Sequence, residues 1–462
     1  MITVMLRAGR NKDFGNGSIP KIILAQAIPL TVSQLASLLY NIVDRIYIGH
    51  IPDIGTDALT GLGLTFPIIT MISAFTLLAG QGGSPVFSMA RGAGNDKKAK
   101  KVLDNSFIML TVLAVILTLV GMLFKKPIIY ALGGSDITYP YSEAYLNIYL
   151  WGTVMLMLST GLNFYIAAQG FPMQAMVTTL AGAAINTILD PVFIFALGMG
   201  IKGAAVATLI SQAVSFVWVL GFLMSRKSII RLDITRLQFS PRICLEIVSV
   251  GFTGFVMEFT NSVVQMVCNR QLKLYGGDIY VGIMTIVNSV RSIMALAING
   301  ITSGAQPVLG FNYGAGKYDR VRSSIRFSFI IATCYTAFAW LVIFLFPKFF
   351  ISLFSDDAAL NSIAVPYLHI YFMAYIFMAL QYSGQSTFMA LGKSGRSIFF
   401  SIFRKFILVV PLTLALPYFM DPPVTGIFWA EPVSNIIGGS ASFAAMYFTL
   451  YRKLQPAKTL LK

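Results

Sequence analysis

The chain alternates between long apolar segments and short polar ones. Twelve of the apolar segments are long enough to cross the hydrocarbon layer of a membrane as a helix, which takes about 20 mostly apolar residues. They span approximately 22–48, 61–85, 103–124, 142–168, 173–197, 203–224, 244–270, 279–305, 324–346, 364–390, 397–418 and 424–450. None shows the period-two alternation of a transmembrane β-barrel. The pattern predicts an all-α integral membrane protein with twelve transmembrane helices.

Composition supports this class. Of the 462 residues, 56% are hydrophobic and only 11% are charged, whereas soluble globular proteins carry about 25% charged residues. So little charge cannot cover a water-facing surface of this size. The three cysteines, Cys244, Cys268 and Cys334, lie in apolar segments and cannot pair evenly, which excludes a secreted disulfide scaffold. Two histidines and no paired cysteine motif do not fit a zinc site.

The basic residues indicate the orientation in the membrane. Lys and Arg concentrate on the cytoplasmic side of membrane proteins. With both termini inside, 26 of the 34 Lys and Arg residues fall on cytoplasmic segments and six on outer loops, while Arg45 and Arg291 lie within predicted helices. The cytoplasmic groups lie before the first helix, at 91–101, 226–242, 317–326 and 393–405, and after residue 451. We therefore expect a multi-pass protein of a prokaryotic cytoplasmic membrane with cytoplasmic termini. The net charge of +16 is therefore explained by basic cytoplasmic segments that also contact anionic lipid headgroups, and it does not indicate nucleic-acid binding.

The two halves of the chain repeat at an offset of 222 residues. The motif at 82–86 recurs at 304–308, Gly-Ala-Gly at 92–94 recurs at 314–316, and the tyrosine-rich segment 145–149 recurs at 367–371. Six helices in each half make these parallel repeats, related by a pseudo-two-fold axis along the membrane normal. The expected organisation is an N-terminal six-helix lobe (1–225), a cytoplasmic linker (226–243) and a C-terminal six-helix lobe (244–462). Two such lobes are typical of an alternating-access transporter, and a monomer is expected to be complete.

Short motifs across the chain resemble those of the multidrug and toxic compound extrusion (MATE) family. The matching residues are Ile28-Pro29, Asn41-Ile42-Val43-Asp44, Ile48-Gly49-His50, Gly80-Gln81-Gly82, Gly92-Ala93-Gly94, Gly304-Ala305-Gln306-Pro307 and Gly426-Ile427-Phe428-Trp429-Ala430-Glu431-Pro432. The resemblance implies a secondary active multidrug antiporter, not an enzyme. Such a protein exports organic, often cationic, compounds in exchange for Na⁺ or H⁺ by alternating access and needs no other cofactor.

Acidic residues within the apolar segments are candidates for the coupling site. A charged side chain at the bilayer centre costs about 2.5–3.5 kcal/mol, so each needs a functional or pairing explanation. Asp44, Asp190 and Glu258 stand out. Asn186 lies four residues before Asp190, so both project from one face of a helix, and Thr208 adds a hydroxyl from the next helix. Oxygen ligands suit a hard cation such as Na⁺, and two adjacent carboxylates away from water also hold a proton readily.

The family resemblance narrows this site. In the branch with DinF- and MepA-type members, the N-lobe cation site uses an Asp in helix 1, an Asn-x-x-x-Asp pair in helix 5 and a Thr in helix 6. Asp44, Asn186, Asp190 and Thr208 match that pattern. The NorM-type branch instead places acids in helices 7 and 10, and this chain has no acid in helix 10. Coupling is therefore expected in the N-terminal lobe. The alternative, that Asp44 and Asp190 only fix helix packing, stays open.

A substrate cleft is predicted from fewer signals. Its candidates are Gln34, Met257, Glu258 and Arg291. Because Glu258 and Arg291 lie in consecutive helices, they form either a buried ion pair or a site where Glu258 binds a substrate cation. His369 is expected to be a packing residue. Arg45 is expected to extend away from Asp44, because adjacent positions on a helix do not face each other. The alternative is an internal network of Asp44 and Arg45, which would lower the pKa of Asp44 and favour Na⁺ over H⁺.

Two other functions are alternatives to export. A lipid-linked oligosaccharide flippase of the same superfamily would share the lobes, but it would need a basic cleft for pyrophosphate, and Arg45 and Arg291 are the only bases expected inside the membrane. A membrane-embedded enzyme would need a catalytic constellation. The chain has no nucleophile elbow, and its Gly-Ala-Gly turns lack the Gly-Lys-Ser/Thr element of a phosphate-binding loop.

Overall fold

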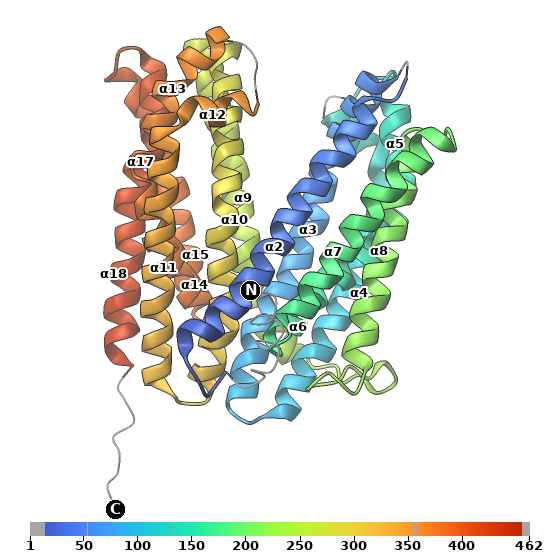
Figure 1. Cartoon of the computed structure of the whole chain (residues 1–462), viewed down its shortest axis with the longest axis vertical. Helices are drawn as coiled ribbons and strands as arrows, with labels where there is room; N and C mark the ends of the chain where they lie inside the picture. The colour runs from blue at the N-terminus through green and yellow to red at the C-terminus, as the bar shows by residue number, and fades with distance from the viewer. Residues whose placement is uncertain (1–13, 53, 133, 355–357, 455–462) are drawn as a thin grey trace, which may run out of the picture. The chain divides into compact units, whose positions relative to one another are not determined.

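The computed structural model describes residues 14–52, 54–132, 134–354 and 358–454. The secondary structure of these residues is helical, with short connecting segments and no β-strand (Figure 1). Among them, nine helices are long and apolar enough to cross a membrane, or up to eleven if each of two bent helix pairs forms one span. The predicted all-α membrane fold is therefore confirmed. The last predicted segment, 424–450, is a helix with a π-helical turn in its middle.

The helices follow the predicted segments closely. Those of the first half are α2 (Ile19–Gly49), α3 (Gly55–Gly92), α4 (Asp96–Ala131), α5 (Tyr139–Trp151), α6 (Thr153–Ala168), α7 (Pro172–Pro191) with the π-helical turn η1 (Val192–Ala196), and α8 (Ile201–Met224). Those of the second half are α9 (Pro241–Gly276), α10 (Asp278–Gly314), α11 (Tyr318–Leu345), α12 (Pro347–Ser352), α13 (Ala358–Phe372), α14 (Met378–Ala390), α15 (Ser394–Ile402) with the π-helical turn η4 (Phe403–Val409), α16 (Val410–Ala415), α17 (Pro423–Ser434) and α18 (Ser440–Thr449).

Two segments expected to be continuous helices are bent. The segment 142–168 divides into α5 and α6, which meet at Gly152 with an angle of 56°. The segment 364–390 divides into α13 and α14 with an angle of 41°. Hydrophobicity alone does not reveal such a bend, because both arms are apolar. Gly152 is equivalent to Ala374 at the repeat offset, so the bend belongs to the repeated architecture.

The backbone repeats at the same offset as the sequence. Three hydrogen bonds close the end of α3, from the backbone N–H groups of residues 93–95, and their equivalents at 315–317 close the end of α10. At the centre of each turn a glycine takes a left-handed conformation, with φ of 70° at Gly94 and 68° at Gly316. Only glycine adopts such angles without steric cost, which explains why the Gly-Ala-Gly motif is present in both halves.

Contacts divide the described chain into two compact units. Unit 1 contains residues 32–251, and unit 2 contains residues 14–31 and 252–454. These units differ from the predicted lobes because the first part of α2 belongs to unit 2. Phe14 is fully buried there, and its carbonyl accepts hydrogen bonds from Asn312 Nδ2 and Arg320 Nη2, both at 3.0 Å. The apolar pattern of α2 gives no information about which neighbours it packs against.

The connecting segment after α8 is fixed to unit 1 by side-chain amides. The Asn105 amide donates to the Gln238 carbonyl at 2.8 Å and accepts from the Ser240 backbone N–H at 2.8 Å. Gln169 Oε1 accepts from the Ser228 hydroxyl at 3.0 Å and from the Ile230 backbone N–H at 2.9 Å. The segment predicted as a linker is thus ordered against α4 and the end of α6.

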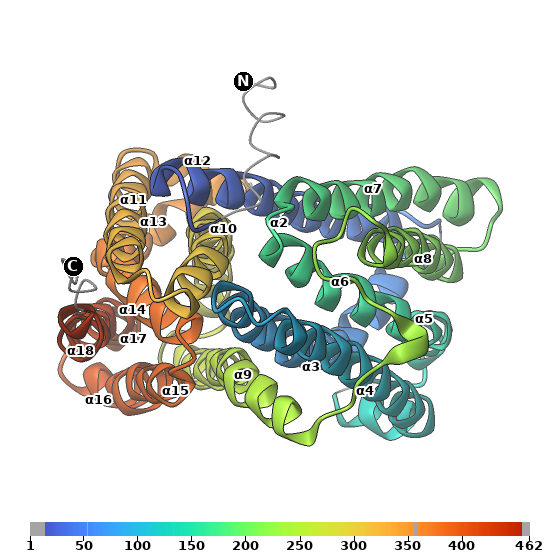
Figure 2. The ribbon, with the colours of Figure 1, turned by 90° about the horizontal axis from the view of Figure 1, so that it is seen from below.

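Within each unit the helices pack side by side, as the view from below shows (Figure 2). In unit 1, α3 packs against α4 and α6, and α7 against α8. The tightest approach in unit 1 joins α3 to the first part of α9, where a Cβ on Gly251 would collide with the Leu78 carbonyl and one on Gly82 would collide with Gly251. Small residues allow helix backbones to approach this closely in membranes.

Replacing Gly251 by Ala should destabilise unit 1. The added methyl has no space against the α3 backbone, so the two helices must separate, and overpacking of this kind costs about 1–3 kcal/mol. The measurement is the thermal unfolding midpoint of the purified protein in detergent. Gly221→Ala is the control, because Gly221 lies in α8 with nothing within 4 Å of its added Cβ. Equal midpoints for both variants would contradict the close approach.

Candidate cation site in unit 1

Four side chains predicted as a coupling site come together in unit 1. Asp44 projects from α2, Asn186 and Asp190 from α7, and Thr208 from α8. All are buried, with exposed fractions of 9% for Asp44, 1% for Asn186, 0% for Asp190 and 8% for Thr208. Asn186 Nδ2 donates to Asp190 Oδ1 at 3.1 Å and to Thr208 Oγ1 at 3.3 Å. The carboxylates of Asp44 and Asp190 are close enough for their charges to interact.

Local structure explains the position of Asp190. The spacing of four residues places Asn186 and Asp190 on the same face of α7, one turn apart. Directly after Asp190, Pro191 interrupts the helix and the backbone continues as the π-helical turn η1. Proline lacks the N–H that would complete the α-helical hydrogen bonding. Such π-helical turns are frequent at functional sites because they displace a helix face locally.

Three buried oxygens in this cluster have no hydrogen-bond donor among the described residues. They are Asp44 Oδ1, Asn186 Oδ1 and Asp190 Oδ2. A buried polar atom without a partner is costly, with a typical penalty of about 1–3 kcal/mol. Because Asn186 directs its amide hydrogens to Asp190 and Thr208, its own oxygen is left for another ligand. Carboxylate, amide and hydroxyl oxygens together are the donor set that a hard cation prefers, so the residues fit Na⁺, and the carboxylates also fit a proton.

Tyrosines of α5 cover the cluster, which the sequence analysis did not predict. Tyr145 interacts with Thr208 and with Asp44, and it is only 3% exposed. Its ring stacks on Tyr149 with centroids 5.7 Å apart. These rings shield the carboxylates and strengthen the electrostatic attraction for a bound cation. The four-residue spacing of two tyrosines in the repeated segment 145–149 was a signal that could have identified them.

Arg45 points away from the site, as expected. Its side chain is exposed, and its guanidinium lies 4.8 Å from the centroid of the Phe66 ring in α3. In the part of the chain that the structure describes, it forms no ion pair with Asp44. The negative charges of the cluster therefore lack a directly bonded basic partner.

The residues predicted to line a substrate cleft are distributed over both units. Gln34 is half-buried in α2 within unit 1. In unit 2, Met257 and Arg291 line a pocket, whereas Glu258 is exposed and is not among the residues that line it. No ion pair joins Glu258 to Arg291 within the described residues. The proposed buried pair is therefore absent, although their charges interact at longer range. His369 stacks on Phe344 with centroids 4.2 Å apart, which fits a packing role.

Unit 2 contains a buried charge cluster that was not predicted from the sequence. Glu431 of α17 accepts from Arg404 Nη1 at 3.0 Å and from Lys405 Nζ at 3.3 Å, and all three side chains are nearly inaccessible. Arg404 and Lys405 were counted as cytoplasmic topology residues, which is wrong: both are buried in the π-helical turn η4, inside an apolar span. All three already lay within predicted helices, so the rule applied to Asp44 would have found them.

Within the described residues no group of three His, Cys, Asp or Glu side chains is arranged to hold a metal ion. Ionisable side chains buried within apolar helices commonly mark ion or substrate pathways in membrane proteins. The fold and the cluster therefore define a multi-pass membrane protein with a candidate ion site.

Comparison with known proteins identifies the family. The MatE family model matches residues 29–192 and 255–415, so the chain belongs to the MatE family. It is similar to the multidrug export protein MepA of Staphylococcus saprophyticus, with 24% identity over 434 residues that cover 94% of this chain and 95% of MepA. It is equally similar to an FAD transporter of Shewanella oneidensis, with 24% identity over 450 residues that cover 95% and 96% of the two chains.

Solved structures show the same fold. A MATE crystal structure in the bent conformation superimposes with a TM-score of 0.90 at 21% identity and covers 97% of this chain and 98% of the other. The chain therefore belongs to the MatE family and has its fold, and the two relatives named above are described as transporters.

Proposed function

We propose that this protein exports organic compounds across the cytoplasmic membrane in exchange for Na⁺ or H⁺ by alternating access. The observation that carries the proposal is the set of donor-free oxygens of Asp44, Asn186 and Asp190 in unit 1. A cation or proton bound there supplies the missing partner. Its loading and release change the relative stability of two conformations. Both termini are proposed to lie in the cytoplasm, as the distribution of basic residues indicates.

The energy available is sufficient for coupling. Moving one positive charge down a membrane potential releases about 2.3 kcal/mol per 100 mV. A coupling free energy between two ligand sites is typically about 1–3 kcal/mol. One cation per cycle therefore suffices to bias a transporter between its two openings.

Separate ion gradients test the proposal. Liposomes containing the purified protein are loaded with Na⁺, or buffered to an acidic lumen. They are diluted into medium with a cationic dye, rhodamine 123, or an anionic dye, fluorescein, while the membrane potential is clamped at zero. Outward flow of the coupling ion should accelerate uptake of the transported dye, because antiport drives dye inward. Protein-free liposomes give the background. Uptake that responds to neither gradient with either dye would refute coupled antiport.

A lipid-linked oligosaccharide flippase is a second candidate that one observation favours. Such a flippase needs a basic cleft for pyrophosphate, and the sequence predicted only two bases, Arg45 and Arg291, inside the membrane. Arg404 and Lys405 are also buried, so more basic groups are present than the sequence predicted. The names of the relatives, a multidrug exporter and an FAD transporter, also leave the charge of the substrate open. Translocation of a fluorescent lipid-linked pyrophosphate across the reconstituted bilayer, measured by chemical quenching from outside, would support the flippase and oppose the exporter.

A further inference from the structure

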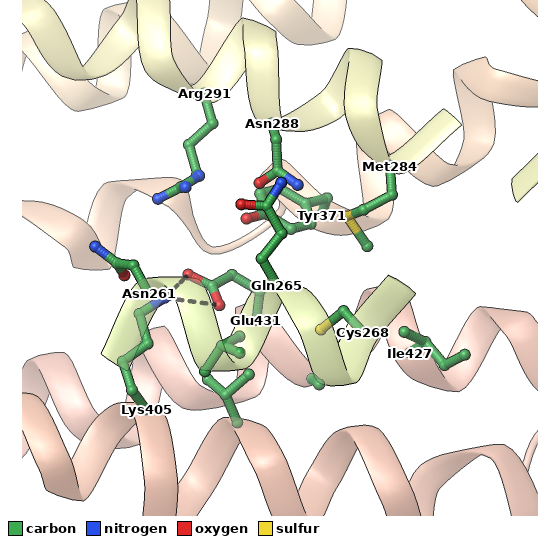
Figure 3. A pocket seen from close by; sticks show the side chains of 13 residues that line it. Asn261, Gln265, Cys268, Met284, Asn288, Arg291, Tyr371, Lys405, Ile427 and Glu431 are labelled. Carbon is green, nitrogen blue, oxygen red and sulfur yellow. Dashed lines mark hydrogen bonds and ion pairs between the residues drawn. The ribbon is translucent and has the colours of Figure 1, made fainter. Parts of the chain in front are cut away.

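Unit 2 contains a polar pocket that no residue of the cation site enters. Two adjoining cavities share Asn261, Arg291 and Lys405 among their lining residues. Figure 3 shows Arg291 descending from α10 toward the side of the pocket where Asn261 and Lys405 lie, with Gln265 and Asn288 beside it.

The charges that line this pocket are predominantly positive. The first cavity has Arg291 and Lys405 against one acid, Glu431. The second has Arg291, Arg404 and Lys405, and no acid among its lining residues. Its other polar lining groups are neutral and come from Asn261, Gln381, Tyr382, Gln385 and Ser401. Glu431 is shared by two bases, so it does not neutralise the whole group.

Arg291 forms no ion pair with any described residue, and its Nε is buried without a hydrogen-bond acceptor. Glu431 and the exposed Glu258 act on the Arg291 charge through space, without an ion pair. An arginine held in an apolar span without an anion is costly, so the pocket as a whole has an excess positive charge that a bound anion would neutralise.

We propose that the unit 2 pocket binds the carboxylate or phosphate group of an organic anion through Arg291 and Lys405. This inference rests on the proposed export function and assigns a substrate class to it. The planar guanidinium of arginine matches the two oxygens of such a group, and the lysine ammonium adds a compact charge beside it. The amides of Asn261 and Gln381 supply neutral hydrogen-bond donors. Met257, Met378 and Tyr382 provide apolar and aromatic surface for the body of the ligand.

Equilibrium binding to the purified, detergent-solubilised protein tests the proposal. Fluorescein and rhodamine 123 share a xanthene–phenyl scaffold but carry opposite net charges near neutral pH, so they differ mainly in the property under test. Fluorescence polarisation should show tighter binding of fluorescein. Arg291→Gln should weaken fluorescein binding by about tenfold or more, since a hydrogen bond to a charged group contributes about 1.5–3 kcal/mol. Rhodamine 123 binding should stay unchanged or become stronger. Displacement by benzoate or by phenyl phosphate identifies the preferred anionic group.

Two further variants keep the test decisive. Arg291→Lys retains the charge without the planar fork and should lose less fluorescein affinity than Arg291→Gln. Arg270→Gln removes an exposed arginine from the outer part of α9 and should change nothing. If Arg291→Gln does not fold, the proposal is tested by the dye preference of the unmodified protein and by the fluorescein affinity of Arg291→Lys. A preference for rhodamine 123, or fluorescein binding that is independent of Arg291, would overturn the proposal.

The test is separate from that of coupled export. No ion gradient is present in the binding measurement. Fluorescein binding through Arg291 without gradient-driven transport would refute the proposed function and leave the anion site standing. Gradient-driven transport of rhodamine 123 without fluorescein binding would support coupled export and refute the anion site.

Discussion

Asp190→Asn should abolish the gradient-driven part of transport. The substitution preserves shape, and its amide oxygen still accepts the 3.1 Å hydrogen bond from Asn186. It removes a negative charge from a buried site where neither carboxylate forms an ion pair with a described basic residue, so the affinity for a cation falls steeply. We expect the rate of dye uptake under the effective ion gradient to fall to that of protein-free liposomes, while expression and the thermal midpoint remain close to those of the unmodified protein.

The control for this variant is Asp96→Asn. Asp96 is an exposed acid in the first turn of α4, in the same unit, and its replacement should leave the gradient response intact. Asn keeps the hydrogen bonding that a packing role needs but lacks the negative charge that cation binding needs. The variant therefore distinguishes a coupling role of Asp190 from a packing role. Full gradient-driven uptake by Asp190→Asn would show that Asp44 and Asp190 only pack the helices.

Glu431→Gln should be among the most destabilising single changes in unit 2. Glu431 is 5% exposed and accepts hydrogen bonds from both Arg404 and Lys405. Neutralising it leaves two buried cations facing each other, and breaking a buried pair by removing one partner costs about 3–5 kcal/mol. The expected result is a thermal midpoint lowered by several degrees in detergent.

A second substitution should restore part of the loss. Lys405→Met in the Glu431→Gln background removes one of the uncompensated cations, so the double variant should be more stable than Glu431→Gln alone. Glu246→Gln is the matched control. It breaks an ion pair with Lys98 of similar length, 2.8 Å, at a half-exposed position, where such pairs contribute about 0–1 kcal/mol. Equal destabilisation by Glu431→Gln and Glu246→Gln would contradict the cluster's structural role.

The helices were predictable because one physical requirement dominates them. A backbone in hydrocarbon must satisfy its own hydrogen bonds, so every apolar run of sufficient length becomes a helix. The bend at Gly152 was not predictable, because it depends on which neighbours the two arms pack against. The assignment of the first part of α2 to unit 2 depends on the same kind of packing information.

The cation site of unit 1 was more predictable from the sequence than the charge cluster of unit 2. Asn186 and Asp190 lie one turn apart on one helix, so their common face follows from helix geometry alone. The proximity of Thr208 and Asp44 was expected from family resemblance, not from spacing. Glu431 bonds bases 26 and 27 residues away on another helix. Their meeting depends on the rotation of two helices, which the π-helical turn η4 changes further. Because Arg404 and Lys405 were assigned to a cytoplasmic segment, their ion pairs with Glu431 were not predicted.

The backbone is repeated in the two halves, but the buried side chains of the cation site are not. At the offset of 222 residues, the positions of Asp44, Asn186, Asp190 and Thr208 are taken in the second half by Met266, Leu408, Leu412 and Ala430. The turn glycines, by contrast, are retained in both halves. A duplicated gene thus preserved the residues that shape the chain while the interiors diverged, and one ancestral half has become two chemically specialised ones. Selection can therefore alter the ligand held by either half without having to redesign the scaffold of the other.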